Sequence, residues 1–190
     1  MGGFCKVLLI IAIIALILGS ALFVGVLAVN GWGFGNIGSK NNVTNTHTVT
    51  EDFGSIAVVG SSDSVVIVPS EDGICRIECT ENEKRLHSVK IENGTLKIAQ
   101  NDNLSWLEKV ICSWNKTSVK VYLPVGVYEK LTVDTTAGDV SLGGGFVFSD
   151  VDISLTTGNV SISDLTANDV KVDTTTGDIT VSLKLHEPTP

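Results

Sequence analysis

Three copies of one short phrase decide the fold of this chain: LTVDTTAGDVSL at residues 131–142, VDISLTTGNVSI at residues 151–162 and VKVDTTTGDITV at residues 170–181. The copies begin 20 and then 19 residues apart. A repeat of this length with a glycine at one fixed place is typical of solenoids, in which each repeat forms one coil stacked on the next. The sequence therefore predicts rungs of about 20 residues whose equivalent positions lie above one another.

Within each copy, apolar and polar residues alternate on both sides of a turn. The alternation predicts short strands with one buried face. The turn contains a glycine, which can adopt a positive φ, followed by Asp or Asn, whose side chain can cap the backbone. The predicted corner residues are Gly138, Asp139, Gly158, Asn159, Gly177 and Asp178. A column of stacked carboxylates could also bind a cation, but turn capping is the simpler interpretation of the same residues.

Residues 7–29 form a run of 23 uncharged and almost wholly apolar positions. As a helix this run would be about 35 Å long, enough to cross a hydrocarbon layer of about 30 Å. The run predicts a transmembrane signal anchor in contact with the lipid bilayer, with residues 1–6, including Lys6, in the cytoplasm. A cleaved signal peptide is the alternative, although its apolar region is usually shorter. The predicted location is the cell membrane, single-pass, with the bulk of the chain extracytoplasmic.

After this run the composition changes twice. Residues 30–51 are rich in Gly, Asn and Thr and predict a flexible stalk. Residues 52–190 predict an extracytoplasmic β-solenoid domain, interrupted at residues 101–117 by an irregular excursion that lacks the strand pattern. Asn93-Gly94 lies between two alternating runs and predicts a β-hairpin.

The three cysteines of the predicted outer domain offer one covalent link. Cys75 and Cys79 lie on the same face of a predicted strand, about 13 Å apart, so they cannot bond to each other. Cys112 could form a disulfide with Cys75 or Cys79 on neighbouring strands, and three buried thiols are the alternative.

The charges and the remaining motifs exclude several functions. The net charge of −8 argues against nucleic acid as a partner. Nucleophile motifs, phosphate-binding glycine loops and metal-binding HExxH or CxxC patterns are absent from the sequence. The histidines, at positions 47, 87 and 186, are scattered. We therefore expect no catalytic residue, no cofactor and no metal site, and we expect that the protein is not an enzyme.

The phrase VKVYLPVGVYEKLTVDTTAGDV at residues 119–140, the Gly-Asp repeats after it and NGTLKI at residues 93–98 resemble the putative-adhesin β-helix family of cell-envelope proteins. The resemblance extends from Phe53 to the end of the sequence. It implies a parallel β-helix, often carried on a membrane anchor and sometimes encoded beside envelope-stress regulators. The expected fold class is thus all-β: a single-stranded right-handed parallel β-helix preceded by one transmembrane α-helix.

Uniform short rungs on a stalk favour a non-enzymatic adhesion or envelope-interaction module that presents Thr, Ser, Asp and Asn side chains. Its partner would be an envelope polymer, a host glycan or a membrane protein, and the open C-terminal rung would allow self-association. Two alternatives are an accessory protein of an envelope-stress regulatory system and, more remotely, a polysaccharide-active β-helix enzyme. The enzyme would need clustered acids and bases in a groove, a feature that the sequence does not indicate.

Overall fold

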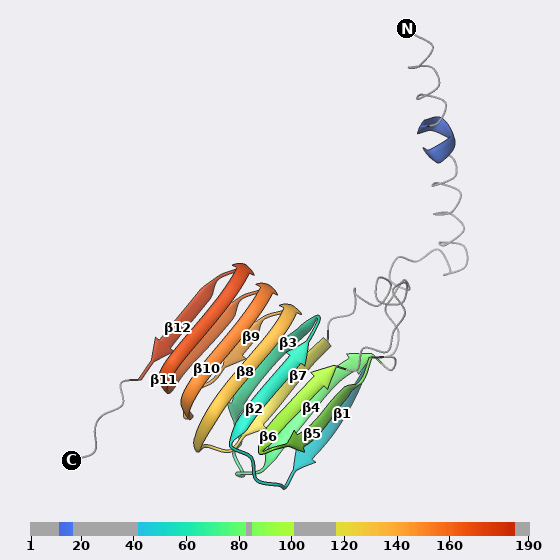
Figure 1. Ribbon diagram of the computed structural model, residues 1–190. Coiled ribbons are helices and arrows are strands. Elements are labelled where there is room, and N and C mark those ends of the chain that lie inside the picture. The colour runs from blue at the N-terminus through green and yellow to red at the C-terminus, as the bar shows by residue number, and fades with distance from the viewer. Residues whose placement is uncertain (1–11, 17–41, 83–84, 101–116, 185–190) are drawn as a thin grey trace, which may run out of the picture. The chain divides into compact units, whose positions relative to one another are not determined.

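A computed structural model describes residues 12–16, 42–82, 85–100 and 117–184 of the chain. Contacts within the chain divide it into two units, Met1–Lys40 and Asn41–Pro190. All described strands belong to the second unit (Figure 1).

The first unit corrects the expectation of one transmembrane helix over residues 7–29. Its described part is a helical stretch at residues 12–16. In the described ranges, no helix has the length and apolar character needed to cross a membrane. Residues 7–11 and 17–29 lie outside the described part.

The described part of the second unit is all-β and contains twelve strands. Their bounds are β1 Asn42–Val49, β2 Ser55–Gly60, β3 Asp63–Pro69, β4 Cys75–Asn82, β5 His87–Glu92, β6 Thr95–Gln100, β7 Thr117–Leu123, β8 Val127–Ala137, β9 Val140–Leu142, β10 Val147–Thr157, β11 Val160–Thr176 and β12 Ile179–Leu183.

These strands form one mixed sheet that folds over on itself. The hydrogen-bonded order is β1-β4-β7-β3-β9-β11-β10-β8-β2-β6-β5, and β12 pairs with β11 off this path. The fold occurs within β11, whose first residues pair with β9 and whose later residues pair with β10. We call β1, β4, β7, β3, β9, the start of β11 and β12 half-sheet A, and β5, β6, β2, β8, β10 and the rest of β11 half-sheet B.

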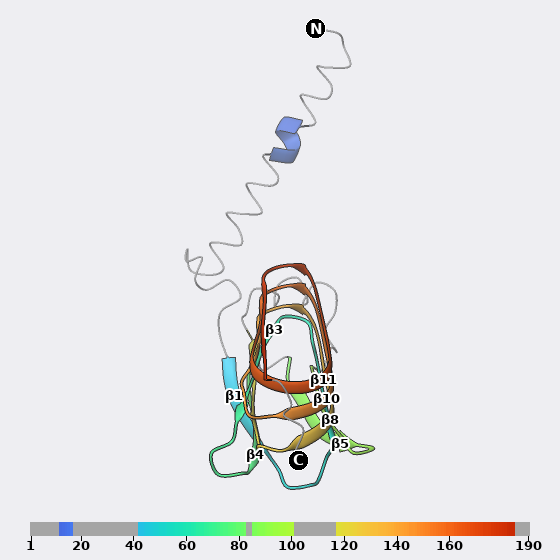
Figure 2. The ribbon, with the colours of Figure 1, turned by 90° about the vertical axis from the view of Figure 1, so that its left-hand side faces the viewer.

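The three sequence repeats are stacked in parallel. Val151 is the register partner of Leu131 in β8 and of Val170 in β11, and Val160 is the partner of Val140 and of Ile179. Residues 20 or 19 positions apart therefore lie side by side on both half-sheets. Figure 2, seen from the side of β12, shows these coils following one another around a common interior.

The rungs do not follow one another in chain order. β2 pairs with β6 on one side and β8 on the other, and β3 pairs with β7 and β9. The rung made by β2 and β3 is therefore central, although it comes before its neighbours in the sequence. After β3 the chain moves outward to β4, returns through β6 and β7, and crosses to the other side of the central rung at β8.

The pairing corrects the expected fold class, because the solenoid is not a single-stranded, wholly parallel β-helix. β5 pairs antiparallel with β6, and β4 pairs antiparallel with both β7 and β1. The physical reason lies in the turns. Asn93 and Gly94 have φ values of 52° and 72°, and such a two-residue turn joins only antiparallel strands.

β1 lies within residues 30–51, where the sequence favoured a stalk. All eight of its residues are in register with β4, from Asn42 opposite Asn82 to Val49 opposite Cys75. A polar strand can be an edge strand because its backbone supplies the pairing whatever its side chains are. The expected excursion at residues 101–117 lies outside the described residues except for Thr117, which begins β7.

One core fills the space between the half-sheets. Its buried side chains come from β2 and β3 as well as from the repeats, including Ile56, Val65, Leu131 and Ile153. Near one corner the core is aromatic, and the ring centroids of Tyr128 and Phe148 lie 5.4 Å apart. The early strands and the repeats thus stabilise each other through shared apolar contacts.

Candidate functional site

The corner residues are joined by a ladder of hydrogen bonds from rung to rung. The amide of Asn159 donates to Oδ1 of Asp139 at 2.8 Å, and the amide of Asp178 donates to Oδ1 of Asn159 at 2.9 Å. The adjoining glycines, at positions 138, 158 and 177, have φ values of 123°, 145° and 140°. Each Asx side chain therefore caps the backbone of the next rung, which accounts for the column without a bound cation.

Cys75 and Cys79 are free, buried thiols on the inward face of β4. Burial raises the pKa of Cys75 to about 11. Burial, followed by the charges of Glu81 and Asp63, raises the pKa of Cys79 to about 12. Cys112 lies outside the described residues, so its disulfide with Cys75 or Cys79 stays a prediction.

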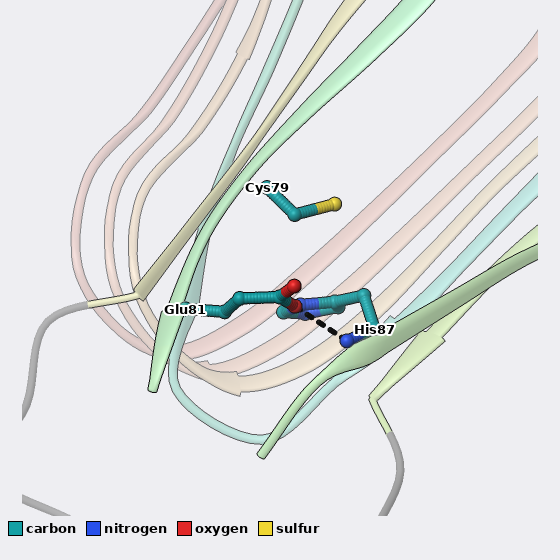
Figure 3. A group of neighbouring side chains, drawn as sticks. All are labelled: Cys79, Glu81 and His87. Carbon is teal, nitrogen blue, oxygen red and sulfur yellow. Dashed lines mark hydrogen bonds and ion pairs between the residues drawn. The ribbon is translucent and has the colours of Figure 1, made fainter. Parts of the chain in front are cut away.

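A cluster of titratable side chains lies between the half-sheets and was not predicted from the sequence. It contains Asp63 at the start of β3, Glu81 near the end of β4 and His87 at the start of β5. Figure 3 shows Glu81 and His87 reaching toward each other from their two strands, with Cys79 beside them. The side chains of Asp63, Glu81 and His87 are closed to solvent, with exposed fractions of 0% for Asp63 and 1% for Glu81 and His87.

His87 is held between the two carboxylates. Its Nδ1 lies 2.6 Å from Oε2 of Glu81, and its Nε2 lies 3.2 Å from Oδ2 of Asp63. The backbone amide of His87 also donates to Glu81. The second oxygen of Glu81 accepts a hydrogen bond of 2.6 Å from Nδ2 of Asn45. We call Asp63, Glu81 and His87 the buried triad.

The charges of the triad determine the protonation of its histidine. Burial lowers the pKa of His87, but the contact with Asp63 and its charge, and then those of Glu81, outweigh burial and raise the pKa. A buried carboxylate is costly unless it is paired and hydrogen-bonded. A protonated His87 supplies a hydrogen-bonded partner to Glu81 and a charged partner to Asp63, whose carboxylate oxygens have no hydrogen-bond partner among the described residues.

A second group of polar side chains continues this layer beside the triad. Nη2 of Arg85 donates to Oε1 of Gln100 at 2.7 Å and to Oγ of Ser61. Ser61 also donates to the same oxygen of Gln100 at 2.7 Å. Arg85 is 5% exposed, so this end of the core is polar but largely closed to water.

Cys79, Glu81 and His87 are the described residues that could hold a metal ion together. One ligand atom of each lies within 4.8 Å of the other two. Metal binding requires a thiolate and a neutral imidazole nitrogen. Here each imidazole nitrogen faces a carboxylate, and the pKa values of Cys79 and His87 are both raised, which favours their protonated forms. The arrangement fits an ion triad better than a metal centre.

One signal in the sequence could have located the triad. Cys75, Ile77 and Cys79 face inward on β4, and the same alternation places Glu81 inward. A carboxylate on the buried face of a strand needs a buried partner. The identity of that partner could not be read from the sequence, because Asp63 and His87 come from other strands whose rung order is not the chain order.

A surface pocket of about 510 Å³ lies near the start of β4. Its lining includes the acids Glu51 and Asp52 and the aromatic residues Phe53 and Tyr128. The hydroxyl of Tyr128 donates to the carbonyl of Pro124 at 2.7 Å, and burial raises its pKa to about 12. Tyr128 is therefore poorly suited to act as a general acid there.

The outer face of half-sheet A places hydroxyl side chains side by side. Thr80 is the register partner of Thr44 and of Ser118, and Ser118 is the partner of Ser64. These four residues, which we call the hydroxyl column, cross four neighbouring strands with a spacing of about 4.8 Å. Beside the column, the Tyr122 ring has Nζ of Lys120 at 4.7 Å from its centroid.

The sequence profile of one protein family, described as Toastrack DUF4097, matches residues 53–184. The chain belongs to this family. The Toastrack match includes β2 to β12 and leaves the edge strand β1 outside. The family-level resemblance predicted from the sequence is confirmed. Among the curated proteins, none matches the chain.

The solved structures that match this Toastrack chain have low sequence identity to it. A putative cell adhesion protein from Clostridium sporogenes is 7% identical with a TM-score of 0.46, over 76% of this chain and 100% of the other. A putative adhesin from Parabacteroides distasonis is 14% identical with a TM-score of 0.42, over 75% and 66%. One from Bacteroides fragilis is 13% identical with a TM-score of 0.36, over 76% and 99%.

Proposed function

We propose that this Toastrack domain is a non-enzymatic adhesion module that binds an extended, hydroxyl-rich polymer, such as an envelope polysaccharide or a host glycan. The outer face of half-sheet A would be the binding surface. The observation that carries the proposal is the hydroxyl column, because its four side chains project at regular intervals from four paired strands.

The column suits an extended ligand more than a compact one. Its members are spaced by about 4.8 Å along a line across the strands, and each hydroxyl can both donate and accept a hydrogen bond. Thr44 is exposed, and Thr80, Ser118 and Ser64 are half-buried, so all four are open to solvent to some degree. A chain of sugar units lying across the strands would meet one hydroxyl after another.

Charged and aromatic side chains beside the column are already held in place. The Tyr122 hydroxyl donates to Glu78 at 3.2 Å, and the Tyr122 ring lies against Lys120 and 6.0 Å from the Arg76 guanidinium. Side chains that are fixed before binding lose less conformational entropy when a ligand arrives. This group would therefore contribute polar and stacking contacts at low cost.

Burial of the triad supports a non-enzymatic role. Among the described residues, Asp63, Glu81 and His87 combine acids and a base within contact distance, as acid–base catalysis would require. Their side chains are 0–1% exposed, so a polymer on the surface cannot reach them. The triad serves the fold, and the outer faces remain for binding.

The test compares two isosteric substitutions in the full chain. Thr80→Val removes a hydroxyl from the centre of the column, and Thr132→Val removes an outward hydroxyl from half-sheet B as the matched control. Binding to insoluble cell-wall polysaccharide and to immobilised glycans is measured by co-sedimentation. We expect the parent to bind, Thr80→Val to weaken binding about threefold to tenfold and Thr132→Val to leave binding unchanged, since each hydrogen bond contributes about 0.5–1.5 kcal/mol.

Two results would contradict the proposal. One is a folded parent that binds none of these polymers. The other is equal weakening by Thr132→Val and Thr80→Val, which would place the contact elsewhere than on half-sheet A.

A further inference from the structure

The last rung carries the same apolar residues as the rungs before it, but they face solvent. Val140 and Val160 are each 1% exposed, whereas Ile179, the next residue in their column, is 45% exposed. Leu142 and Ile162 are each 1% exposed, and Val181 in the same column is 41% exposed. The end of the described solenoid therefore presents an unfinished apolar core.

The backbone of the last rung is also unfinished within the described residues. β12 pairs with β11 alone, and residues 166–176 of β11 pair with β10 alone. At the corner, Asp139 and Asn159 each accept an amide hydrogen bond from the following rung. No described residue follows Asp178 in this ladder. The side chain of Asp178 therefore occupies the same acceptor position as Asp139 and Asn159, but no described amide donates to it.

We propose that this edge, made by β12 and residues 166–176 of β11, pairs with the same edge of a second copy of the chain. A two-fold axis would pass beside the middle of β12 and beside the middle of residues 166–176. It would place each of these strands antiparallel to its own copy, in an isologous contact. Unpaired edges of this kind are sites of chain-to-chain pairing. The contact would bury the apolar side chains of both open ends.

The positions of Val172 and Val181 along their strands fit a two-fold axis. Val172 lies five residues before the corner Gly177, and Val181 lies four residues after it. The two residues are thus at nearly equal distances along the strands from the same corner. One axis perpendicular to the half-sheets can therefore pass close to both, and it would place each opposite its own copy.

When the edge pairs with its own copy about this axis, its charges face opposite charges of the partner. Lys171 and Asp173 flank Val172 on the outer face, with side chains 65% and 63% exposed. Antiparallel pairing centred on Val172 places Lys171 opposite the partner's Asp173 and Asp173 opposite the partner's Lys171. On β12 the same pairing, centred on Val181, places Ile179 opposite the partner's Leu183. This match favours a second copy as the occupant.

The first test is a charge reversal followed by its repair. The mass of the full chain is measured over a range of concentrations by sedimentation, for the parent, Lys171→Asp, Asp173→Lys and the double swap. Each single variant brings two pairs of like charges together, and the double variant restores opposite charges. We expect a dimer in the parent, about a tenfold weaker dimer in each single variant, and recovery in the double variant. Equal thermal stabilities would show that the variants fold alike.

The second test fixes the register. In Val181→Cys the two new thiols would meet at the axis, and mild oxidation should give a disulfide between two copies of residue 181, identified by peptide mass spectrometry. In Thr180→Cys the thiol would face the partner's Ser182, and we expect far less of that disulfide. A monomer at all concentrations, a dimer unaffected by charge reversal, or equal crosslinking at positions 180 and 181 would overturn the proposal. A dimer lost on truncation after Lys184 would assign the contact to the segment beyond the edge and would also overturn it.

Discussion

The backbone amide of Asn159 donates a 2.8 Å hydrogen bond to the carboxylate of Asp139, 20 residues earlier in the chain. This bond joins two corners that are adjacent in space because each repeat makes one full turn. The same relationship recurs between Asn159 and Asp178. Side chains at the corners thus support the rung order that the strands establish.

Replacing Asn159 with Ala should lower the free energy of unfolding by about 1 kcal/mol, because the amide of Asp178 loses its acceptor. Urea unfolding followed by circular dichroism measures the change. Ser161→Ala, on the exposed face of β11, is the control and should change stability by less than about 0.5 kcal/mol. Equal effects of the two substitutions would show that the corner ladder does not stabilise the fold.

Gly158, beside Asn159 at its corner, should tolerate substitution far less than a glycine in an open turn. A Cβ at position 158, where φ is 145°, would overlap the backbone carbonyl of Gly138. At Gly73, φ is 72° and nothing lies within 4 Å of the added atom. We expect Gly73→Ala to cost about 1 kcal/mol from backbone strain alone.

Gly158→Ala must in addition displace a neighbouring rung, so we expect a loss above about 4 kcal/mol or failure to fold. Thermal unfolding of the two variants measures the difference. Similar melting temperatures for Gly73→Ala and Gly158→Ala would contradict the close approach of the corners.

His87 should make stability depend on pH in a defined direction. Its pKa in the folded state is raised above the ordinary value of 6.5, so the fold holds the proton more tightly than the unfolded chain does. The stabilisation is complete below about pH 6.5 and is lost as the pH rises through the raised pKa. His87→Gln should cost about 3–5 kcal/mol near pH 6, because Glu81 and Asp63 lose their buried partner.

The measurement is the difference in unfolding free energy between the parent and His87→Gln from pH 6 upward. We expect this difference to shrink as the pH rises. His47→Gln, a substitution on the edge strand β1, is the control. A difference that stays constant or grows with pH would show that His87 is not protonated between the two carboxylates.

The inward cysteines should be unreactive in the folded protein. Burial contributes most to the raised pKa values of Cys75 and Cys79, about 11 and 12, and only the thiolate reacts with iodoacetamide. At pH 8 we expect peptide mass spectrometry to find neither residue alkylated before unfolding and both alkylated afterwards. Rapid alkylation of Cys79 in the folded state would contradict its place in the core. Protection that persists in urea without reductant would reveal a disulfide with Cys112.

The repeats could be predicted because their information is local. The alternation around Gly138, Gly158 and Gly177 specifies strands, corners and spacing within each copy, and the structure stacks them in that register. The rung order could not be predicted in the same way. It depends on which strands pair with the central rung of β2 and β3, and β6 and β8 reach opposite sides of β2 from distant parts of the chain.

The antiparallel pair β5 and β6 could have been predicted from the sequence. The turn at Asn93 and Gly94 was a hairpin signal, and a hairpin is incompatible with a wholly parallel coil. The expected fold class followed the parallel repeats at residues 131–181 and did not include this antiparallel pair. The buried triad was harder to predict, because Asp63, Glu81 and His87 have no shared spacing and come from three different strands, β3, β4 and β5.

A double-cysteine crosslink tests the stacking of rungs most directly. Ser141 and Ser161 are exposed register partners on β9 and β11, about 4.8 Å apart, within the range that a disulfide spans. Ser141 and Ser163 are out of register by two residues and lie about 8 Å apart. Mild oxidation of the full chain, read by peptide mass spectrometry, should link positions 141 and 161 in Ser141→Cys/Ser161→Cys and leave 141 and 163 unlinked in Ser141→Cys/Ser163→Cys. Linkage of the second pair and not the first would contradict the parallel stack.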